Sequence, residues 1–384
     1  PANAFVSEAQ CATSQPAYPL DLWFCKNCTH VQLLDIVEPR LLFEDYPYVS
    51  GTSPVFVSHF EEYADDLIGR FGFESGNLIV DIGSNDGTLL RLFQAAGMNV
   101  LGIDPAHAIA ESATASGVPT QTGFFNLSTA LDIRSQYGAA SCITANNVFA
   151  HIDDLGNVAD GVRELLSPDG IFVFEVSYLL DVYEKILFDT IYHEHLDYHT
   201  VAPLQPFFEA HGLELFAAKR VDTHGGSLRG FAQLAGGRHP ANGLDDLTDK
   251  ERRAGLHCAE TLRGYSARID GVGRQLGELI AALKRDGKRL AGYGAPAKAT
   301  TLMHHFGIGR DQIEFIVDDN PRKQGLFSPG LHVPVLPSKV LAEQEPDYLV
   351  ILAWNFADPI MQKCREFAAR GGRFIVPLPT VRVV

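Results

Sequence analysis

The chain has 384 residues, a formal net charge of −16 and 46% hydrophobic residues, which predicts a globular protein of two or three domains at about 150 residues per domain. The acidic balance argues against general binding to nucleic acid or to an anionic membrane surface. Because no apolar run approaches the roughly 18 residues of a membrane span and no signal peptide is visible, we expect a cytoplasmic enzyme or binding protein.

The first 52 residues contain a cysteine pair at metal-ligand spacing. Cys25 and Cys28 stand between two short strand-like runs, and the six cysteines of the chain are too few for a disulfide framework. Structural zinc takes four ligands, and only Cys11 and His30 lie nearby. We interpret residues 1–52 as a small zinc-ribbon-like segment whose other half lies upstream. A redox pair or two plain buried thiols are the alternatives.

The next stretch, residues 43–56, places Tyr46 and Tyr48 around a proline and ahead of a Ser/Gly/Thr tract. These tyrosines belong either to a functional segment or to a linker in which they only pack. Residues 55–71 then have apolar side chains at helical spacing. They predict an amphipathic helix that leads into the next domain.

Residues 78–90, LIVDIGSNDGTLL, predict a nucleotide-binding strand, turn and helix. Gly83 and Gly87 leave the turn without side-chain walls, so a ligand can lie against the backbone at the helix N-terminus. About twenty residues later, Asp104 ends a second strand, where a carboxylate can hold two ribose hydroxyls. Because Asp81 precedes the first glycine, the turn suits an ammonium group better than a phosphate. S-adenosylmethionine (SAM) fits this pattern, and an ordinary tight turn is the alternative.

Apolar strands at 78–82, 99–103, 142–146 and 170–176 alternate with helical patterns and predict a doubly wound parallel sheet of the α/β class. Ligands in such sheets bind beyond the carboxyl ends of the strands. Residues at these ends, and an aromatic residue placed to cover an adenine or to pack in the core, give the cofactor candidates. They are Asp81, Gly83, Asn85, Gly87, Asp104, Pro105, Phe124 and Asn147. Glu175 and Tyr178 follow the fourth strand and are expected at the same crevice.

The stretch FDTIYHEHLDYHT, residues 188–200, concentrates three histidines, two tyrosines and three acids after a sheet strand. Such density favours general acid–base catalysis. The alternatives are a satisfied polar cluster and a metal site, for which no fitting third ligand is evident nearby.

The second half of the chain predicts a second nucleotide-binding unit. Strands at 213–217 and 228–235 are joined through His224, which either faces the site or caps a turn, and a long helix then runs to about residue 286. The segment GYGAPAK follows a strand at 289–291 and satisfies Gly-x-Gly-x-x-Ala. Its Lys298 suits a diphosphate. We therefore expect a second Rossmann-like domain.

Several motifs together resemble the nucleotide-sugar C-methyltransferases of deoxysugar pathways. They are DIGSNDG at 81, YHEH at 192, HGG at 224, GYGAPAK at 292, DDNPRKQG at 318, SPG at 328 and AWN at 353, and the resemblance extends over essentially the whole chain. It implies a zinc-binding N-terminal domain (1–52), a class I methyltransferase domain that binds SAM (53–244) and a C-terminal Rossmann-like domain that binds the sugar nucleotide (245–384). It also implies methylation at C3 of a 4-keto-6-deoxy sugar linked to dTDP.

The resemblance also implies site residues. The family pattern Tyr-x-Glu-His falls on Tyr192, Glu194 and His195, and its Tyr-Pro-Tyr segment begins at Tyr46 and ends at Tyr48. In our hypothesis His195 removes the proton next to the ketone, Glu194 orients His195, and Tyr192 or Tyr48 donates to the enolate oxygen. The substrate candidates are Tyr46, Tyr178, His224, Gly294, Lys298 and Lys323, and the metal candidates are Cys25 and Cys28. The family's second Cys-x-x-Cys, which lies upstream, is missing from this sequence.

Three other functions are compatible with parts of the pattern. A sugar-nucleotide O-methyltransferase needs a base but no enolate. An NAD-dependent sugar oxidoreductase would use the Gly-x-Gly-x-x-Ala turn for its cofactor. A non-catalytic nucleotide-binding scaffold would have no use for the polar stretch 188–200. In each case the expected partner is a small molecule, with no nucleic acid and no membrane.

Overall fold

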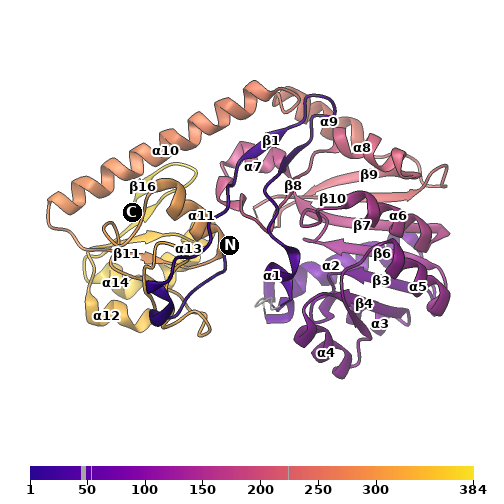
Figure 1. Cartoon of the computed structure of the whole chain (residues 1–384), viewed down its shortest axis with the longest axis horizontal. Coiled ribbons are helices and arrows are strands. Elements are labelled where there is room, and N and C mark those ends of the chain that lie inside the picture. The colour runs from indigo at the N-terminus through magenta and orange to yellow at the C-terminus, as the bar shows by residue number, and fades with distance from the viewer. Residues whose placement is uncertain (45–48, 53, 224) are drawn as a thin grey trace.

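A seven-stranded sheet forms the centre of the larger of two lobes (Figure 1) in the computed structural model, which describes residues 1–44, 49–52, 54–223 and 225–384. The strand order is β5-β4-β3-β6-β7-β10-β9. The strands are β3 (Leu78–Ile82), β4 (Asn99–Asp104), β5 (Thr120–Thr122), β6 (Ala140–Asn146), β7 (Leu166–Ser177), β9 (Leu213–Val221) and β10 (Ser227–Leu234). The four strands predicted from 78 to 176 are confirmed, and β5 is an additional short edge strand.

The sheet is parallel from β5 to β7, and β10 runs antiparallel to both of its neighbours. β9 and β10 are connected by only residues 222–226. A connection this short can join antiparallel neighbours, whereas parallel neighbours need a longer crossover. The strand order reverses between β3 and β6, so their carboxyl ends open the crevice in which such sheets bind ligands.

Helices cover both faces of the central sheet. One face packs on α2 (Pro54–Phe71) and α3 (Thr88–Ala95), and the other packs on α5 (Leu127–Tyr137), α6 (Leu155–Leu165) and α8 (Val201–Ala210). The remaining helices of this lobe are α4 (His107–Ala115), α7 (Leu179–Lys185) and the 3-10 helix η3 (Phe188–Thr190). The predicted helix over residues 55–71 is confirmed as α2. None of the helices in the described part of the chain is long and apolar enough to cross a membrane.

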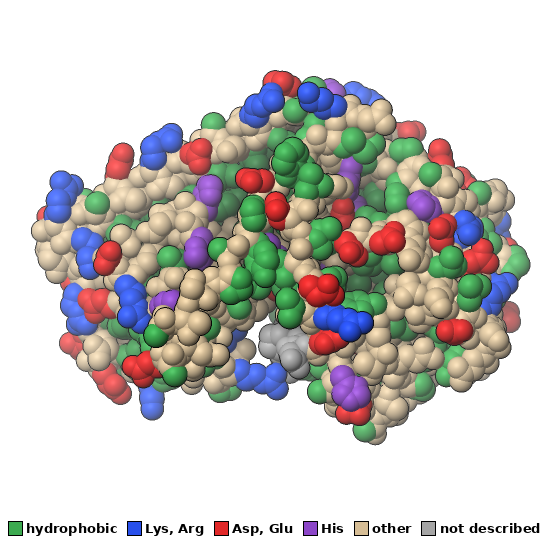
Figure 2. All heavy atoms as spheres, viewed as in Figure 1, with side chains coloured by type: hydrophobic (Ala, Val, Ile, Leu, Met, Phe, Trp, Pro, Cys, Tyr) green, Lys and Arg blue, Asp and Glu red, His purple; other side chains and the backbone are tan. Residues whose placement is uncertain are grey.

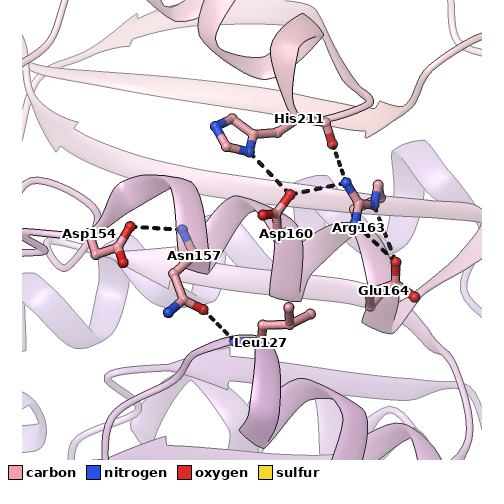
Figure 3. A network of polar contacts seen from close by, with 7 residues as sticks. All are labelled: Leu127, Asp154, Asn157, Asp160, Arg163, Glu164 and His211. Carbon is pink, nitrogen blue, oxygen red and sulfur yellow. Dashed lines mark hydrogen bonds and ion pairs between the residues drawn. The ribbon is translucent and has the colours of Figure 1, made fainter.

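A polar network ties α6 to its neighbours (Figure 3). The side chain of Asp154 accepts from the backbone N–H of Asn157 at 3.0 Å and so caps α6. The Asn157 side chain accepts from the N–H of Leu127 at the start of α5 (2.9 Å), and Asp160 lies 3.1 Å from Nδ1 of His211 at the end of α8. These bonds hold α6 to the start of α5 and to the end of α8.

The smaller lobe contains a six-stranded sheet of order β13-β12-β11-β14-β15-β16. Its strands are β11 (Leu290–Tyr293), β12 (Ile316–Val317), β13 (Val335–Leu336), β14 (Tyr348–Ile351), β15 (Arg373–Val376) and β16 (Arg382–Val383), parallel except for β16. Its helices are α11 (Ala297–Phe306), η4 (Ser338–Val340), α12 (Leu341–Gln344), η5 (Trp354–Phe356), α13 (Ala357–Lys363) and α14 (Arg365–Ala369). The predicted second Rossmann-like unit is confirmed.

Two helices lead from one lobe to the other. α9 (Leu244–Arg253) packs on the larger lobe, where the buried Glu251 accepts from the N–H of Val201 at 2.7 Å. α10 (Ala259–Arg285) then spans the distance to the smaller lobe (Figure 1). The predicted boundary, between residues 244 and 245, falls at the first residue of α9, whose contacts are with the larger lobe. The crossing between lobes is α10.

The amino-terminal segment contacts both lobes (Figure 1). Its elements are η1 (Glu8–Ala12), β1 (Leu22–Phe24), β2 (Val31–Leu33), α1 (Pro39–Phe43) and η2 (Ser50–Thr52). Val6 forms a β-bridge with Phe327 of the smaller lobe, whereas β2 pairs with β8 (Asp197–Tyr198) of the larger lobe. The described residues of this segment therefore contact both lobes, and the boundary expected at residue 52 stays a prediction.

Candidate active site

A cavity of about 1250 Å³ lies between the two lobes and is lined by residues of both. The molecule is visibly hollowed between the lobes in Figure 2. Sites for one drug-sized ligand usually enclose about 300–1,000 Å³, so this cavity has room for two ligands. The predicted residues that line it are Asp81, Gly83, Asn85, Asp104, Pro105, Phe124, Asn147, Tyr192, His195, Gly294, Lys298 and Lys323.

The first glycine-rich turn lines the cavity with its backbone. Gly83 has φ +69°, and a Cβ atom there would lie 2.3 Å from Cγ2 of Val148, so only glycine fits. Asp104 holds the turn in place, because its carboxylate accepts from the N–H of Asn85 and from that of Ala106, each at 2.8 Å. The predicted strand, turn and acid are therefore assembled as one wall of the cavity.

Gly87 has a different role from the one predicted. It precedes α3 with φ +76°, and a Cβ atom there would lie 2.8 Å from Cγ1 of Val118. Gly87 is outside the cavity lining. It is needed for the left-handed turn and for close packing, and it leaves the predicted cofactor set.

Asp81 is an unusual carboxyl group at the floor of the cavity. It is buried, and its Oδ1 accepts from the hydroxyl of Thr144 at 2.6 Å. Burial raises the pKa of Asp81 to about 7, and burial also raises the pKa of the neighbouring Asp104. A cationic ligand would stabilise the ionised form of Asp81 and lower this pKa.

This pKa predicts how SAM binding depends on pH. Below pH 7 most Asp81 side chains of the empty protein are protonated, so Asp81 must lose a proton before it can pair with a cationic ligand, as predicted for the ammonium group of SAM. We expect the SAM dissociation constant to rise as the pH falls from 7 to 5.5, by up to about tenfold per pH unit. Calorimetric titrations over this range measure it. In Asp81→Asn the slope should vanish, and a slope that persists there would assign the titration to another group.

His195 is oriented by the backbone. Its Nδ1 lies 2.7 Å from the carbonyl oxygen of Thr190, an acceptor only, so Nδ1 carries the proton and donates it. Nε2 is then the unprotonated nitrogen that a general base requires. The His195 ring lies 4.1 Å from that of Tyr192 and stacks at 5.0 Å on His151, which also lines the cavity.

His151 was not among the predicted site residues. Burial lowers its pKa well below the usual value, and the charge of His195 lowers it further. Two stacked imidazoles disfavour a second positive charge, so His151 remains the neutral partner of the pair. The sequence signal for His151 was its position five residues after the end of β6, at the same sheet edge as Asn147.

Glu194 is predicted to orient His195, and the structure gives one oxygen of its carboxylate a partner in the amino-terminal segment. Its side chain is 4% exposed, and Oε1 accepts from Nδ2 of Asn3 at 2.9 Å. Glu194 is absent from the cavity lining, whereas the atom that contacts Nδ1 of His195 is the carbonyl oxygen of Thr190. Thr190 therefore takes the orienting role.

Tyr178 is also misassigned by the sequence pattern. Its ring is fully buried, and its hydroxyl donates to Oε1 of Glu251 at 2.8 Å. The side chain thus anchors α9 to the larger lobe and leaves the substrate set. Three further predicted residues, Tyr46, Tyr48 and His224, lie outside the described residues.

The second glycine-rich turn forms the opposite wall. Gly294 has φ +88°, and a Cβ atom there would lie 2.6 Å from Cβ of Ala353. The ammonium group of Lys323 donates to the carbonyl oxygen of Ala295 at 2.6 Å, and burial lowers its pKa. Lys298 lines the cavity at the start of α11. This wall can bind an anionic group.

The cysteine pair is the predicted half of a structural zinc site. Cys25 and Cys28 are exposed, and hydrogen bonds from the backbone N–H groups of Cys28 and Asn27 lower the pKa of Cys25. Across the ranges that the structure describes, no three His, Cys, Asp or Glu residues come together as a metal site. Because structural zinc takes four ligands, the residues present do not complete the site. Zinc binding by this pair stays a prediction.

Comparisons with known proteins address the family directly. Residues 222–379 match the family described as "C-methyltransferase C-terminal domain", residues 56–218 match "Methyltransferase domain" and residues 1–43 match "Putative zinc binding domain". The C-methyltransferase NovU of Streptomyces niveus is 37% identical over 374 residues, which are 97% of this chain and 89% of NovU. The chain belongs to the C-methyltransferase family. It is a SAM-dependent C-methyltransferase, as the resemblance implied.

Two solved methyltransferase structures share less sequence with this C-methyltransferase than NovU does. Magnesium protoporphyrin IX methyltransferase from Synechocystis, solved with bound SAH, is 17% identical, with a TM-score of 0.35 over 47% of this chain and 83% of that chain. A SAM-dependent methyltransferase from Clostridium acetobutylicum is 12% identical, with a TM-score of 0.38 over 47% of this chain and 92% of that chain.

Proposed function

We propose that this C-methyltransferase methylates a carbon next to the ketone of a 4-keto-deoxy sugar nucleotide, with His195 as the base. The observation that carries the proposal is the position of His195. Its ring, held through Nδ1 by Thr190, lines the same cavity as the turn at Gly83 and the turn at Gly294. A base is thus placed between a wall suited to a cationic donor and a wall suited to an anionic acceptor.

The two walls differ in charge in the way that the two ligands require. Asp81 and Asp104 can pair with the ammonium group and ribose hydroxyls of SAM. Lys298 and Lys323 can pair with the diphosphate of a sugar nucleotide. When bound, SAM supplies an electrophilic methyl group. The residues of this chain hold the acceptor carbon opposite that group and remove its proton.

The proposed proton transfer has a defined path. Nε2 of His195 takes the proton from the carbon next to the ketone, and the charge moves to the ketone oxygen as an enolate. The enolate carbon forms a bond to the methyl group while the bond between that methyl group and sulfur breaks, its electron pair stays on sulfur and SAH is left. The ketone re-forms, and His195 later releases the proton to solvent. A positioned base increases the reaction rate by about 10²- to 10⁴-fold, and one hydrogen-bond donor at the enolate oxygen lowers the activation free energy by about 3 kcal/mol. We propose that this donor is Tyr192, a role supported by the contact of its ring with that of His195.

C-methylation next to a ketone leaves two possible carbons on a 4-keto sugar, C3 and C5. The family resemblance favours C3. Family membership favours C-methyl transfer over the O-methyltransferase and oxidoreductase alternatives. The Gly294 turn, although it satisfies a dinucleotide pattern, is therefore proposed to bind the acceptor's diphosphate.

The test is incubation of the full chain with SAM and a dTDP-linked 4-keto-6-deoxy sugar. We expect SAH to form in equal amount to a product with one new methyl group on carbon, located at C3 by two-dimensional NMR. In D₂O, deuterium should enter the same carbon when SAM is replaced by SAH. A methyl group on oxygen, or transfer to free sugars as fast as to the nucleotide, would contradict the proposal.

A further inference from the structure

The stretch that carries His195 is docked onto the smaller lobe. Nε1 of Trp354, in η5, donates to Oδ2 of Asp189 at 2.6 Å. The hydroxyl of Thr301, in α11, donates to the carbonyl oxygen of Ile191 at 2.9 Å. The backbone on either side of Thr190 is thus fixed by residues that come from the other lobe.

A continuous set of contacts connects the acceptor wall to the base. Gly294 lies in van der Waals contact with Ala353, where a Cβ atom would approach to 2.6 Å. Ala353 precedes Trp354, whose indole holds Asp189. Asp189 in turn precedes Thr190, whose carbonyl oxygen accepts from Nδ1 of His195.

Asp189 has few partners for a buried carboxylate. It is 0% exposed, and among the described residues its Oδ1 has no hydrogen-bond partner. Burial raises its pKa to about 6, whereas Lys298 and the indole of Trp354 act in the opposite direction. Both of these compensating residues belong to the smaller lobe. Two of the groups that favour the ionised form of Asp189 thus reach it only through the contact between the lobes.

We propose that Trp354 is a positioning residue for His195, acting through Asp189 and Thr190. Contact with the acceptor-bound smaller lobe then orients the imidazole of His195 for proton removal. The base is therefore correctly oriented only when the wall that binds the acceptor contacts the segment that carries His195. This inference rests on the proposed role of His195. Nothing in the family match or in the name of the relative assigns a role to this tryptophan.

The chain provides a matched control because it has only two tryptophans. Trp354→Phe keeps a ring but removes the N–H donor. Trp23→Phe makes the same change on β1, where the side chain is 53% exposed and outside the cavity lining. We expect Trp354→Phe to lower kcat about tenfold, with the SAM Kd within twofold of wild type. Trp23→Phe should leave both values unchanged.

Two further variants separate positioning from general damage. Asp189→Asn keeps the shape of the side chain but removes the charge that strengthens the indole hydrogen bond, so kcat should fall by a smaller factor than in Trp354→Phe. In a His195→Ala background, Trp354→Phe should cause no further loss of substrate deuterium exchange, because the base that it positions is absent.

The inference is overturned if Trp354→Phe and Trp23→Phe have the same kcat, or if Trp354→Phe lowers exchange by the same factor with and without His195. Should Trp354→Phe fail to fold, the comparison is made with Asp189→Asn in both backgrounds. An active wild type whose activity is unaffected by His195→Ala would instead refute the proposed function. The two failures are therefore distinguishable.

Discussion

Replacing His195 with alanine should lower both methyl transfer and solvent deuterium uptake at the reacting carbon by about 10²- to 10⁴-fold. The two rates should fall together because both begin with removal of the same proton. The measurements are SAH formation by chromatography and deuterium incorporation by NMR with SAH in place of SAM. The SAM Kd should change little, since the donor wall is formed by other residues. His107→Ala, on α4 with a side chain 70% exposed, is a matched control.

His151 gives this experiment a second arm. Because His151 stacks on His195 and lines the cavity, His151→Asn should lower both rates less than His195→Ala does. If deuterium uptake survives in His195→Ala and is lost in His151→Asn, His151 is the base and the assignment made above is wrong. If both variants keep full exchange, neither histidine is the required base and the proton is removed by another group.

Lys298→Met should raise the KM for the sugar nucleotide about 10- to 100-fold. A hydrogen bond to a charged group contributes about 1.5–3 kcal/mol, and 1.4 kcal/mol corresponds to a factor of ten. The SAM Kd should stay within twofold, because Lys298 belongs to the acceptor wall. Steady-state kinetics with each ligand varied in turn measure both constants.

Two controls accompany Lys298→Met. Lys298→Arg keeps the charge and should retain most of the affinity for the acceptor. Lys288→Met removes an exposed lysine of the same lobe that pairs with Asp347 at 3.1 Å, and it should leave the acceptor KM unchanged. A rise in the SAM Kd with no change in the acceptor KM would contradict the assignment, because it would mean that Lys298 contacts SAM and not the sugar nucleotide.

The local elements of this protein could be predicted from its sequence because their causes are local. The alternation of apolar runs defined β3, β4, β6 and β7, and the glycines and acids of the two turns marked both Rossmann-like units. The position of Asp104 relative to Gly83 depends only on one strand–helix–strand unit. In the structure the carboxylate of Asp104 accepts from the N–H of Asn85, in the turn that contains Gly83. The density of titratable groups in residues 188–200 identified the segment that carries His195, the proposed base.

The roles of individual side chains within those segments depended on contacts between residues far apart in the sequence. Glu194 faces Asn3, 191 positions away, and Tyr178 faces Glu251, 73 positions away. At Gly87 a side chain would collide with Val118, so close packing within the protein accounts for this glycine. In an irregular segment the direction of a side chain is determined by whichever remote element packs beside it, so composition alone could not distinguish the base from its neighbours.

The sequence by itself determined the fold class, the two nucleotide-binding turns and the family, because strand periodicity, turn chemistry and motif order are properties of short segments. Only the tertiary structure decided that Thr190 orients His195, that His151 lies against it and that Trp354 reaches Asp189 from the other lobe. Those contacts exist because two lobes and the amino-terminal segment close around one cavity, and their free energy comes from burial that no single segment provides.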